Sequence, residues 1–296
     1  MRKTKLCLGV NKNFPISTEE QIKMFHKVGF EGFFTGPANP EDLVKYRLLA
    51  DELGLIWQSI HAPFGTIDKM WKEGNEAEET LESLKACVHS CYNNRVPIMV
   101  CHAIIGFDKH TPNEIGIRNF EKLVQEAEKC GVKIALENTE GLEYLDALME
   151  HFKGNDTVGF CWDTGHELCY NSGADMMARY GNRLIATHLN DNLGISDEHG
   201  VIAPTDDLHL LPFDGIADWK NIVCRLSKYH YNDILTFELK PISKRGPFEH
   251  DIYKGMPIQI YIAEAYKRAC RVATLMEKTS KDRTFIPNSI SAPTLQ

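Results

Sequence analysis

Eight short apolar runs, each followed by a helical pattern, limit the folds open to this chain more than any other feature. The runs span residues 5–11, 30–36, 55–64, 96–105, 132–140, 158–166, 184–192 and 233–240. Turn residues bound each run, and each run is short enough to be a buried strand. Because strands that alternate regularly with helices form parallel sheets, we expect one parallel sheet with helices outside it.

The helical segments between these runs carry start and stop signals. Ser17 or Thr18 can cap the first helix, and Gly29 can end it. Pro40 stands at a first helical position of the second helix, which reaches Gly54. These signals make the alternation of strand and helix more secure than periodicity alone.

Eight repeats in one uninterrupted chain of 296 residues predict a single (β/α)₈ TIM barrel. We place the barrel over residues 1–280, with a last helix at about 258–277, and a polar tail over 281–296. The alternative is a doubly wound open sheet. It is disfavoured because neither a GxGxxG nor a Walker A pattern follows an early strand.

Composition fits a cytoplasmic protein without a membrane helix. No apolar run approaches the roughly 18 residues that a membrane helix requires. The nine cysteines include no CxxC pair and mostly lie in apolar runs, which indicates reduced, buried thiols. The net charge of −8 is unfavourable for general binding of nucleic acid.

The predicted strands end in side chains that can bind metals. In a TIM barrel the chemistry lies at the carboxyl ends of the strands, so these side chains are expected at one edge. The loop after the seventh run adds a D-x-H pair. The nine candidates are His61, His102, Glu137, Asp163, His166, His188, Asp207, His209 and Glu238.

Each candidate alone has an ordinary structural explanation. A strand histidine is usually a core residue, Glu137 and Asp163 could cap helices or turns, and His209 could be a loop residue. Together they are harder to explain, because four carboxylates at one barrel mouth are costly to bury without a cation. Three carboxylates and one imidazole make a hard ligand set that suits Mn²⁺, Mg²⁺ or Co²⁺ and is compatible with Zn²⁺. We expect no cysteine to compete for this metal.

Several motifs together resemble the xylose isomerase-like TIM-barrel superfamily, over residues 5–277. They are ALENTEG, CWDTGH, THLNDN, LHLLPFDGIADW and FELK. The superfamily includes tagatose 3-epimerase and hydroxypyruvate isomerase types, inosose dehydratases and the endonuclease IV family. The chain is most similar to the branch called sugar phosphate isomerases/epimerases.

The resemblance implies roles for particular residues. Glu137, Asp163, His188 and Glu238 match the metal ligands of the epimerases, with Glu137 and Glu238 as catalytic acid and base. Substrate contacts are implied for His61, His102, Glu143, His166 and His209, the last standing where the epimerases have an arginine. In the endonuclease pattern His61, His102, His166, Asp207 and His209 would be additional ligands, and all nine candidates would hold three zinc ions that serve phosphodiester cleavage in abasic DNA.

Charge near the predicted mouth favours a small sugar or polyol over nucleic acid as substrate. Residues 189–215 contain six acidic residues and neither Lys nor Arg, whereas a DNA-binding rim needs cations. A small basic cluster of Lys240, Lys244 and Arg245 could hold one anion.

We therefore expect a divalent-metal-dependent sugar or sugar phosphate isomerase/epimerase that moves a proton next to a carbonyl through an enediolate-like intermediate. Endonuclease IV-like and inosose dehydratase-like activities are the alternatives, and an inactive sugar-binding barrel is disfavoured because the ligand set is complete. Trp57, Phe64, Phe107 and Trp162 could wall a pocket, although each is better explained as core. Self-association of the chain is left open.

Overall fold

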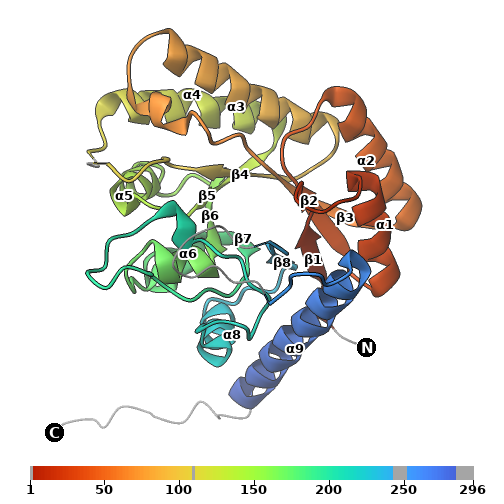
Figure 1. Cartoon of the computed structure of the whole chain (residues 1–296). Coiled ribbons are helices and arrows are strands. Elements are labelled where there is room, and N and C mark those ends of the chain that lie inside the picture. The colour runs from red at the N-terminus through yellow and green to blue at the C-terminus, as the bar shows by residue number, and fades with distance from the viewer. Residues whose placement is uncertain (1–2, 109–110, 243–251, 285–296) are drawn as a thin grey trace, which may run out of the picture.

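Eight parallel strands form a nearly closed barrel with helices around it (Figure 1). The computed structural model describes residues 3–108, 111–242 and 252–284. The sheet order is β7-β6-β5-β4-β3-β2-β1-β8. The strands are β1 (Leu6–Gly9), β2 (Gly32–Thr35), β3 (Ile56–His61), β4 (Ile98–His102), β5 (Lys133–Glu137), β6 (Val158–Asp163), β7 (Leu184–His188) and β8 (Leu235–Phe237).

The barrel closes between β7 and β8 through a few specific contacts. Leu189 and Phe237 form an isolated parallel bridge, and the Leu189 amide donates to the Thr236 carbonyl at 2.8 Å. The Thr236 amide donates to the hydroxyl of Thr187 at 3.1 Å. All eight predicted strands are confirmed, and each is shorter than the apolar run that predicted it.

The helices follow the strands in regular alternation, except after β6. The longer ones are α1 (Thr18–Val28), α2 (Pro40–Leu53), α3 (Asn75–Asn93), α4 (Glu114–Cys130), α5 (Leu142–His151), α8 (Trp219–Lys228) and α9 (Ile258–Thr284). Two short helices, α6 (Thr164–Cys169) and α7 (Met176–Tyr180), replace a long one after β6. The 3₁₀ turns are η1 (Ile67–Trp71), η2 (Gly181–Arg183) and η3 (Pro204–Asp206).

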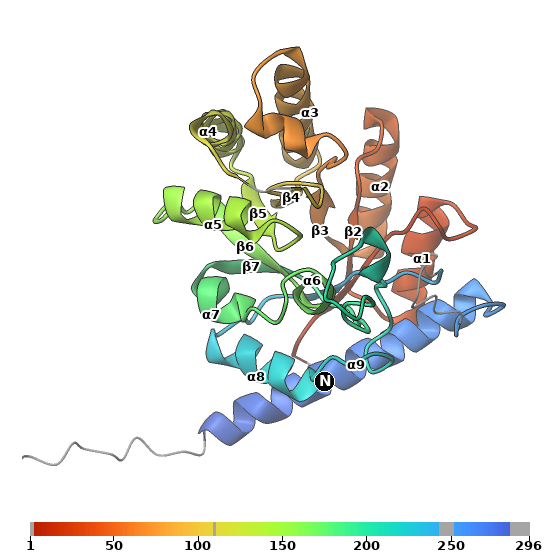
Figure 2. The same ribbon diagram turned by 60° about the vertical axis from the view of Figure 1, so that its left-hand side comes forward.

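The predicted helix signals are confirmed, and the outer ring is completed by the last helix. Ser17 caps α1, Gly29 and Gly54 end α1 and α2 in the left-handed conformation, and Pro40 begins α2. The last helix, α9, runs to Thr284, past its predicted end at residue 277, and packs against α1 and α8 (Figure 2). Of the predicted tail, residues 285–296 lie outside the described residues.

The barrel interior is filled by small side chains directly below the polar strand ends. Side chains two residues apart on a strand point the same way. Ala135, Cys161 and Ala186 therefore lie one step below Glu137, Asp163 and His188, and they form one buried cluster with Ile98 and Val100. This layer places the polar ends of the strands together at the barrel mouth.

All nine cysteines are free thiols, and six of them are buried, as the sequence indicates. Among the described residues no helix is both long enough and apolar enough to cross a membrane.

Candidate metal centre

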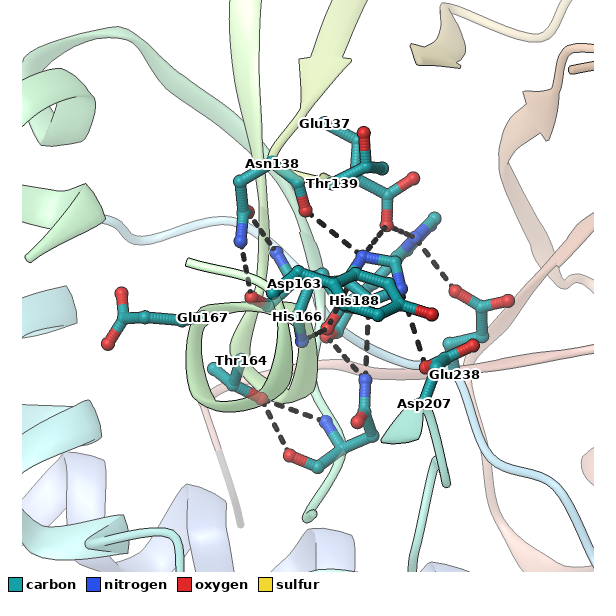
Figure 3. A network of polar contacts seen from close by, with 12 residues as sticks. Glu137, Asn138, Thr139, Asp163, Thr164, His166, Glu167, His188, Asp207 and Glu238 are labelled. Carbon is teal, nitrogen blue, oxygen red and sulfur yellow. Dashed lines mark hydrogen bonds and ion pairs between the residues drawn. The ribbon is translucent and has the colours of Figure 1, made fainter. Parts of the chain in front are cut away.

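The nine candidate residues converge at one end of the barrel. Five of them close β3 to β7, Glu238 follows β8 directly, His166 lies in α6, and the D-x-H pair lies in the loop after β7. Figure 3 shows six of the nine, namely Glu137, Asp163, His166, His188, Asp207 and Glu238. They form three groups in which the candidate ligand atoms lie within 4.8 Å of one another. The groups are His61, His102 and Glu137; Glu137, Asp163, His188 and Glu238; and His166, Asp207 and His209.

Glu137 is the centre of the site and belongs to two groups. Its Oε1 lies 2.9 Å from His188 Nδ1, and its Oε2 lies 3.2 Å from His61 Nε2 and 3.3 Å from His102 Nε2. The side chain is fully buried. Burial alone would raise the pKa of Glu137, but His188 and His102 hold that pKa well below its usual value. The carboxylate is therefore charged and surrounded by imidazoles.

Asp163 ends β6 and begins α6, which explains why a buried strand finishes on a carboxylate. Its Oδ1 accepts the His166 amide at 2.7 Å and so caps the helix. Its Oδ2 accepts a hydrogen bond from the Asn190 side chain at 2.9 Å. The Asn138 side chain pairs with the Asp163 backbone in both directions at 2.8 Å (Figure 3). The capping role and the predicted ligand role are compatible, because the cap fixes the carboxylate within its group.

The close approach of Asn190 requires glycine in the turn. A Cβ placed on Gly165 would lie 1.9 Å from Asn190 Oδ1, which no side chain could tolerate without a shift. In the DTGH motif, Asp163 thus caps the helix, Gly165 allows Asn190 to approach closely, and His166 supplies an imidazole. Burial raises the pKa of Asp163, as expected for a carboxylate in such an enclosed place.

Three histidines have ring nitrogens whose protonation the backbone determines. Nδ1 of His61, His166 and His209 lies 2.8, 3.0 and 3.2 Å from a carbonyl oxygen. A carbonyl only accepts, so each Nδ1 carries the proton, and Nε2 of the neutral ring has a lone pair. That Nε2 faces a carboxylate oxygen of Glu137 or Asp207 at 2.8–3.4 Å. Two facing acceptors require a cation between them or a second proton on the ring.

The raised pKa of His166 likewise indicates that positive charge is required at this ring. Burial opposes its charged form, but Asp163 and Asp207 outweigh burial and raise the pKa of His166 to about 10. Without a metal the ring holds the second proton. A bound divalent cation would take the place of that proton, since metal-binding imidazoles are neutral and usually donate their other N–H to a carbonyl or carboxylate.

Lys240 contacts the third group, and the sequence did not predict this contact. Its Nζ lies 3.2 Å from Asp207 Oδ2, while His209 Nε2 lies 2.8 Å from Asp207 Oδ1. Burial would raise the pKa of Asp207, but His209 and Lys240 hold it well below its usual value. The sequence placed Lys240 in a basic cluster with Lys244 and Arg245, both of which lie outside the described residues. Lys240 instead supplies a cation within the site.

The prediction that no cysteine would compete for metal is wrong. Cys161 lies one strand step below Asp163, and its sulfur lies within 4.8 Å of ligand atoms of Glu137 and His188. Burial raises the pKa of the Cys161 thiol, so the sulfur is neutral. The thiol lies beneath the second group rather than at its open side.

The remaining candidates, which are four aromatic residues and Glu143, are divided between the core and the surface. Trp57 and Trp162 are core residues, whereas Phe64 and Phe107 are 43% and 39% exposed. Phe64 stacks on His102 with ring centroids 4.6 Å apart. Glu143 lies in the first turn of α5 and lines a separate pocket with Phe107.

Asn138 and Asn190 are functional residues that sequence reasoning missed. Each stands within two positions of a predicted ligand, in the motifs ALENTEG and THLNDN, and each holds Asp163 in place. An amide one or two positions from a predicted ligand was the available signal, because ligating carboxylates are usually held by further hydrogen bonds.

The donor set fits a divalent cation. Two buried carboxylates, the partly exposed Glu238 and the imidazole of His188 meet in the second group, and His188 Nδ1 lies 2.9 Å from Glu137 and 3.1 Å from Glu238. Hard oxygen donors with one imidazole suit Mg²⁺, Mn²⁺ or Co²⁺ and are compatible with Zn²⁺. Fold and site together define an α/β barrel with residue groups at its mouth that could hold metal ions.

Comparison with known proteins identifies the family. The family model described as "Xylose isomerase-like TIM barrel" matches residues 22–255, and the chain belongs to this family. The resemblance predicted from the motifs is thus confirmed.

Individual proteins are similar to this chain in sequence or in structure. An uncharacterized protein, y4fM, of Sinorhizobium fredii is 35% identical over 163 residues, which are 51% of this chain and about half (49%) of that protein. The inosose dehydratase of Glaesserella parasuis serovar 5 is 23% identical over 82% of this chain and 88% of its own. A D-psicose 3-epimerase structure with D-tagatose, from Clostridium cellulolyticum H10, has a TM-score of 0.73 at 14% identity and covers 92% of this chain and 99% of that one.

Proposed function

We propose that this protein is a divalent-metal-dependent isomerase or epimerase that acts on a small sugar, sugar phosphate or polyol. The observation that carries the proposal is the second group, in which Glu137, Asp163, Glu238 and His188 surround one point at the barrel mouth. A cation held by this group would polarise a sugar carbonyl and stabilise the negative charge that develops when the neighbouring carbon loses its proton.

Two glutamates are proposed to move the protons. Glu238 has a side chain that is 24% exposed, so the substrate can reach its free edge, whereas Glu137 is fully buried on the inner side of the group. The pKa of each is lowered, since burial is outweighed by His188 for Glu137 and by His209 and His188 for Glu238. Both are therefore deprotonated, which is the form that a general base must have before it accepts a proton.

The remaining histidines would orient these glutamates or contact the substrate. His61 and His102 bind Glu137 Oε2 and hold its plane, while His166 and His209 hold Asp207.

Return of the proton to the opposite face of the same carbon gives an epimer, and return to the neighbouring carbon gives an isomer. Loss of hydroxide after proton removal would give a dehydratase, the activity in the name of one relative.

A second candidate function is supported by a specific observation. All nine candidates sort into three groups, which is the arrangement a trinuclear zinc phosphodiesterase acting on abasic DNA would need. Two features make it less favourable. Lys240 already supplies a positive charge at Asp207, and the loop over 189–215 lacks the Lys and Arg that contact phosphates.

Proton exchange with solvent tests the proposed function. The protein, loaded with Mn²⁺ or Co²⁺, is incubated in D₂O with a panel of aldoses and ketoses, and ¹H NMR follows the hydrogen next to the carbonyl. We expect deuterium to enter one sugar only when cation is present, and Glu238→Gln to slow its entry by about 10²–10⁴-fold. The exposed Glu79→Gln on α3 is the matched control and should exchange normally. Cleavage of an abasic duplex with no exchange into any sugar would overturn the proposal.

A further inference from the structure

A pocket of about 440 Å³ opens at the barrel mouth beside the metal groups. None of the nine candidate ligands is among the residues that line it. Its walls come from the loops that follow β4, β5, β6 and β7, and they include Phe107 and Asp108, residues 140–143, residues 170–172 and residues 200–202. A pocket of this size is in the range that binds small molecules.

One aromatic ring separates this pocket from the metal groups. The Tyr170 ring stacks on His166 with centroids 5.0 Å apart and meets the edge of Phe107 at 5.5 Å. Asn171 fixes this wall, because its side chain bonds the Asn138 side chain and the Thr139 carbonyl, each at 2.8 Å. A molecule that reaches both the metal groups and the pocket must therefore pass a rigid ring and extend beyond a single sugar unit.

The lining combines an exposed aromatic face with a fixed carboxylate. Phe107 is 39% exposed, and the C–H faces of sugars pack on such rings. Glu140 is buried, and its Oε1 accepts the Gly106 amide at 2.7 Å. Its Oε2 has no hydrogen-bond partner among the residues that the structure describes. A carboxylate oxygen held in this way can only accept, and the hydroxyls of a sugar donate.

The charge of the described lining disfavours an anionic ligand. Asp108, Glu140 and Glu143 all lie on the pocket, and among the residues that the structure describes the lining includes neither Lys, Arg nor His. Phosphate is normally held by Arg or Lys, and three carboxylates would repel it. The pocket therefore suits a neutral polyhydroxy group.

We propose that this pocket is a second sugar subsite, which binds an unphosphorylated sugar unit joined to the unit that reacts at the metal groups. The substrate is then a disaccharide or other glycoside with a free carbonyl end, rather than a single sugar phosphate. This inference rests on the proposed function, since it takes the metal groups as the place where the carbonyl end reacts.

Equilibrium binding tests the subsite without requiring turnover. Calorimetry on the Co²⁺-loaded protein compares glucose with cellobiose, maltose and lactose, and cellobiose with cellobiose 6′-phosphate, whose phosphate lies on the distal unit. We expect at least one disaccharide to bind about tenfold more tightly than glucose, and the phosphate to weaken binding. Phe107→Ala should lower disaccharide affinity about fivefold and leave glucose affinity unchanged. Glu140→Gln should strengthen binding of cellobiose 6′-phosphate, because it removes a negative charge and keeps an acceptor.

Matched controls separate this subsite from the metal groups. Phe64→Ala removes an aromatic ring of similar exposure that stacks on His102, and it should weaken glucose and disaccharides alike. The subsite is refuted if no disaccharide binds more tightly than glucose, or if the phosphate strengthens binding. Selective disaccharide binding without proton exchange would support the subsite and contradict the isomerase activity, so the two failures are distinguishable.

Discussion

Replacement of Lys240 by Met should turn the His166, Asp207 and His209 group into a metal site. In the wild-type chain the ammonium group lies 3.2 Å from Asp207 Oδ2, and the lysine side chain is 21% exposed. An ion pair at that distance is worth about 5 kcal/mol at an effective dielectric constant of about 20. Methionine has a similar length and no charge, so it keeps the packing and removes the cation.

The loss leaves a buried carboxylate without its lysine. Breaking such a pair costs about 3–5 kcal/mol, and a divalent cation at the same group would recover much of it. We therefore expect affinity for a metal at this group to rise by about 100-fold or more, since each 1.4 kcal/mol is a factor of ten. Metal content should rise from about one to about two ions per chain.

Calorimetric titration with Zn²⁺ and elemental analysis of the same sample measure this change. Lys72→Met is the matched control, because Lys72 pairs with Asp68 at 2.8 Å on an exposed surface without histidines at the pair. That variant should bind metal as the wild type does. The reasoning is refuted if Lys240→Met, shown to be folded, binds the same number of ions with the same affinity as the wild type.

Three further changes have expected outcomes. Glu137→Gln and Glu238→Gln should each lower turnover by about 10²–10⁴-fold with the fold intact, measured as deuterium entry and circular dichroism; near-normal turnover in either would contradict the two-base assignment. Gly165→Ala should destabilise the protein by about 1–3 kcal/mol in chemical denaturation, because its Cβ collides with Asn190, and should weaken metal binding. Gly36→Ala, which meets open space, is its control, and equal effects would contradict this explanation. If the free cation is present at about 100 times its Kd for the protein, its removal by a chelator should lower the Tm by about 4 °C. An unchanged Tm would argue against a bound metal.

The fold and most of the site were predictable because they depend on periodic, local signals. Each strand ends where an apolar run meets a polar residue, and the strict alternation with helices brings those ends to one edge. Glu137, Asp163 and His188 are therefore predictable without knowledge of the contacts between them. The structure adds that Asp163 caps α6, and this cap is compatible with its predicted ligand role.

The parts that were missed depend on contacts between distant segments. Lys240 pairs with Asp207 across 33 residues, and only the position of the loop after β7 beside β8 brings them together. Cys161 lies close to Glu137 and His188 because β6 stands between β5 and β7 in the barrel. Phe107 is 39% exposed whereas Trp57 is 2% exposed, and the sequence pattern around each aromatic residue does not reveal this difference in burial.

The number of metal ions per chain tests the central claim most directly. The proposed function requires one divalent cation among Glu137, Asp163, His188 and Glu238, with Lys240 providing the positive charge of the third group. Elemental analysis of protein purified without chelator should therefore find about one ion per chain. Close to three zinc ions per chain would contradict this account and favour the phosphodiesterase, and the absence of any bound metal would contradict both.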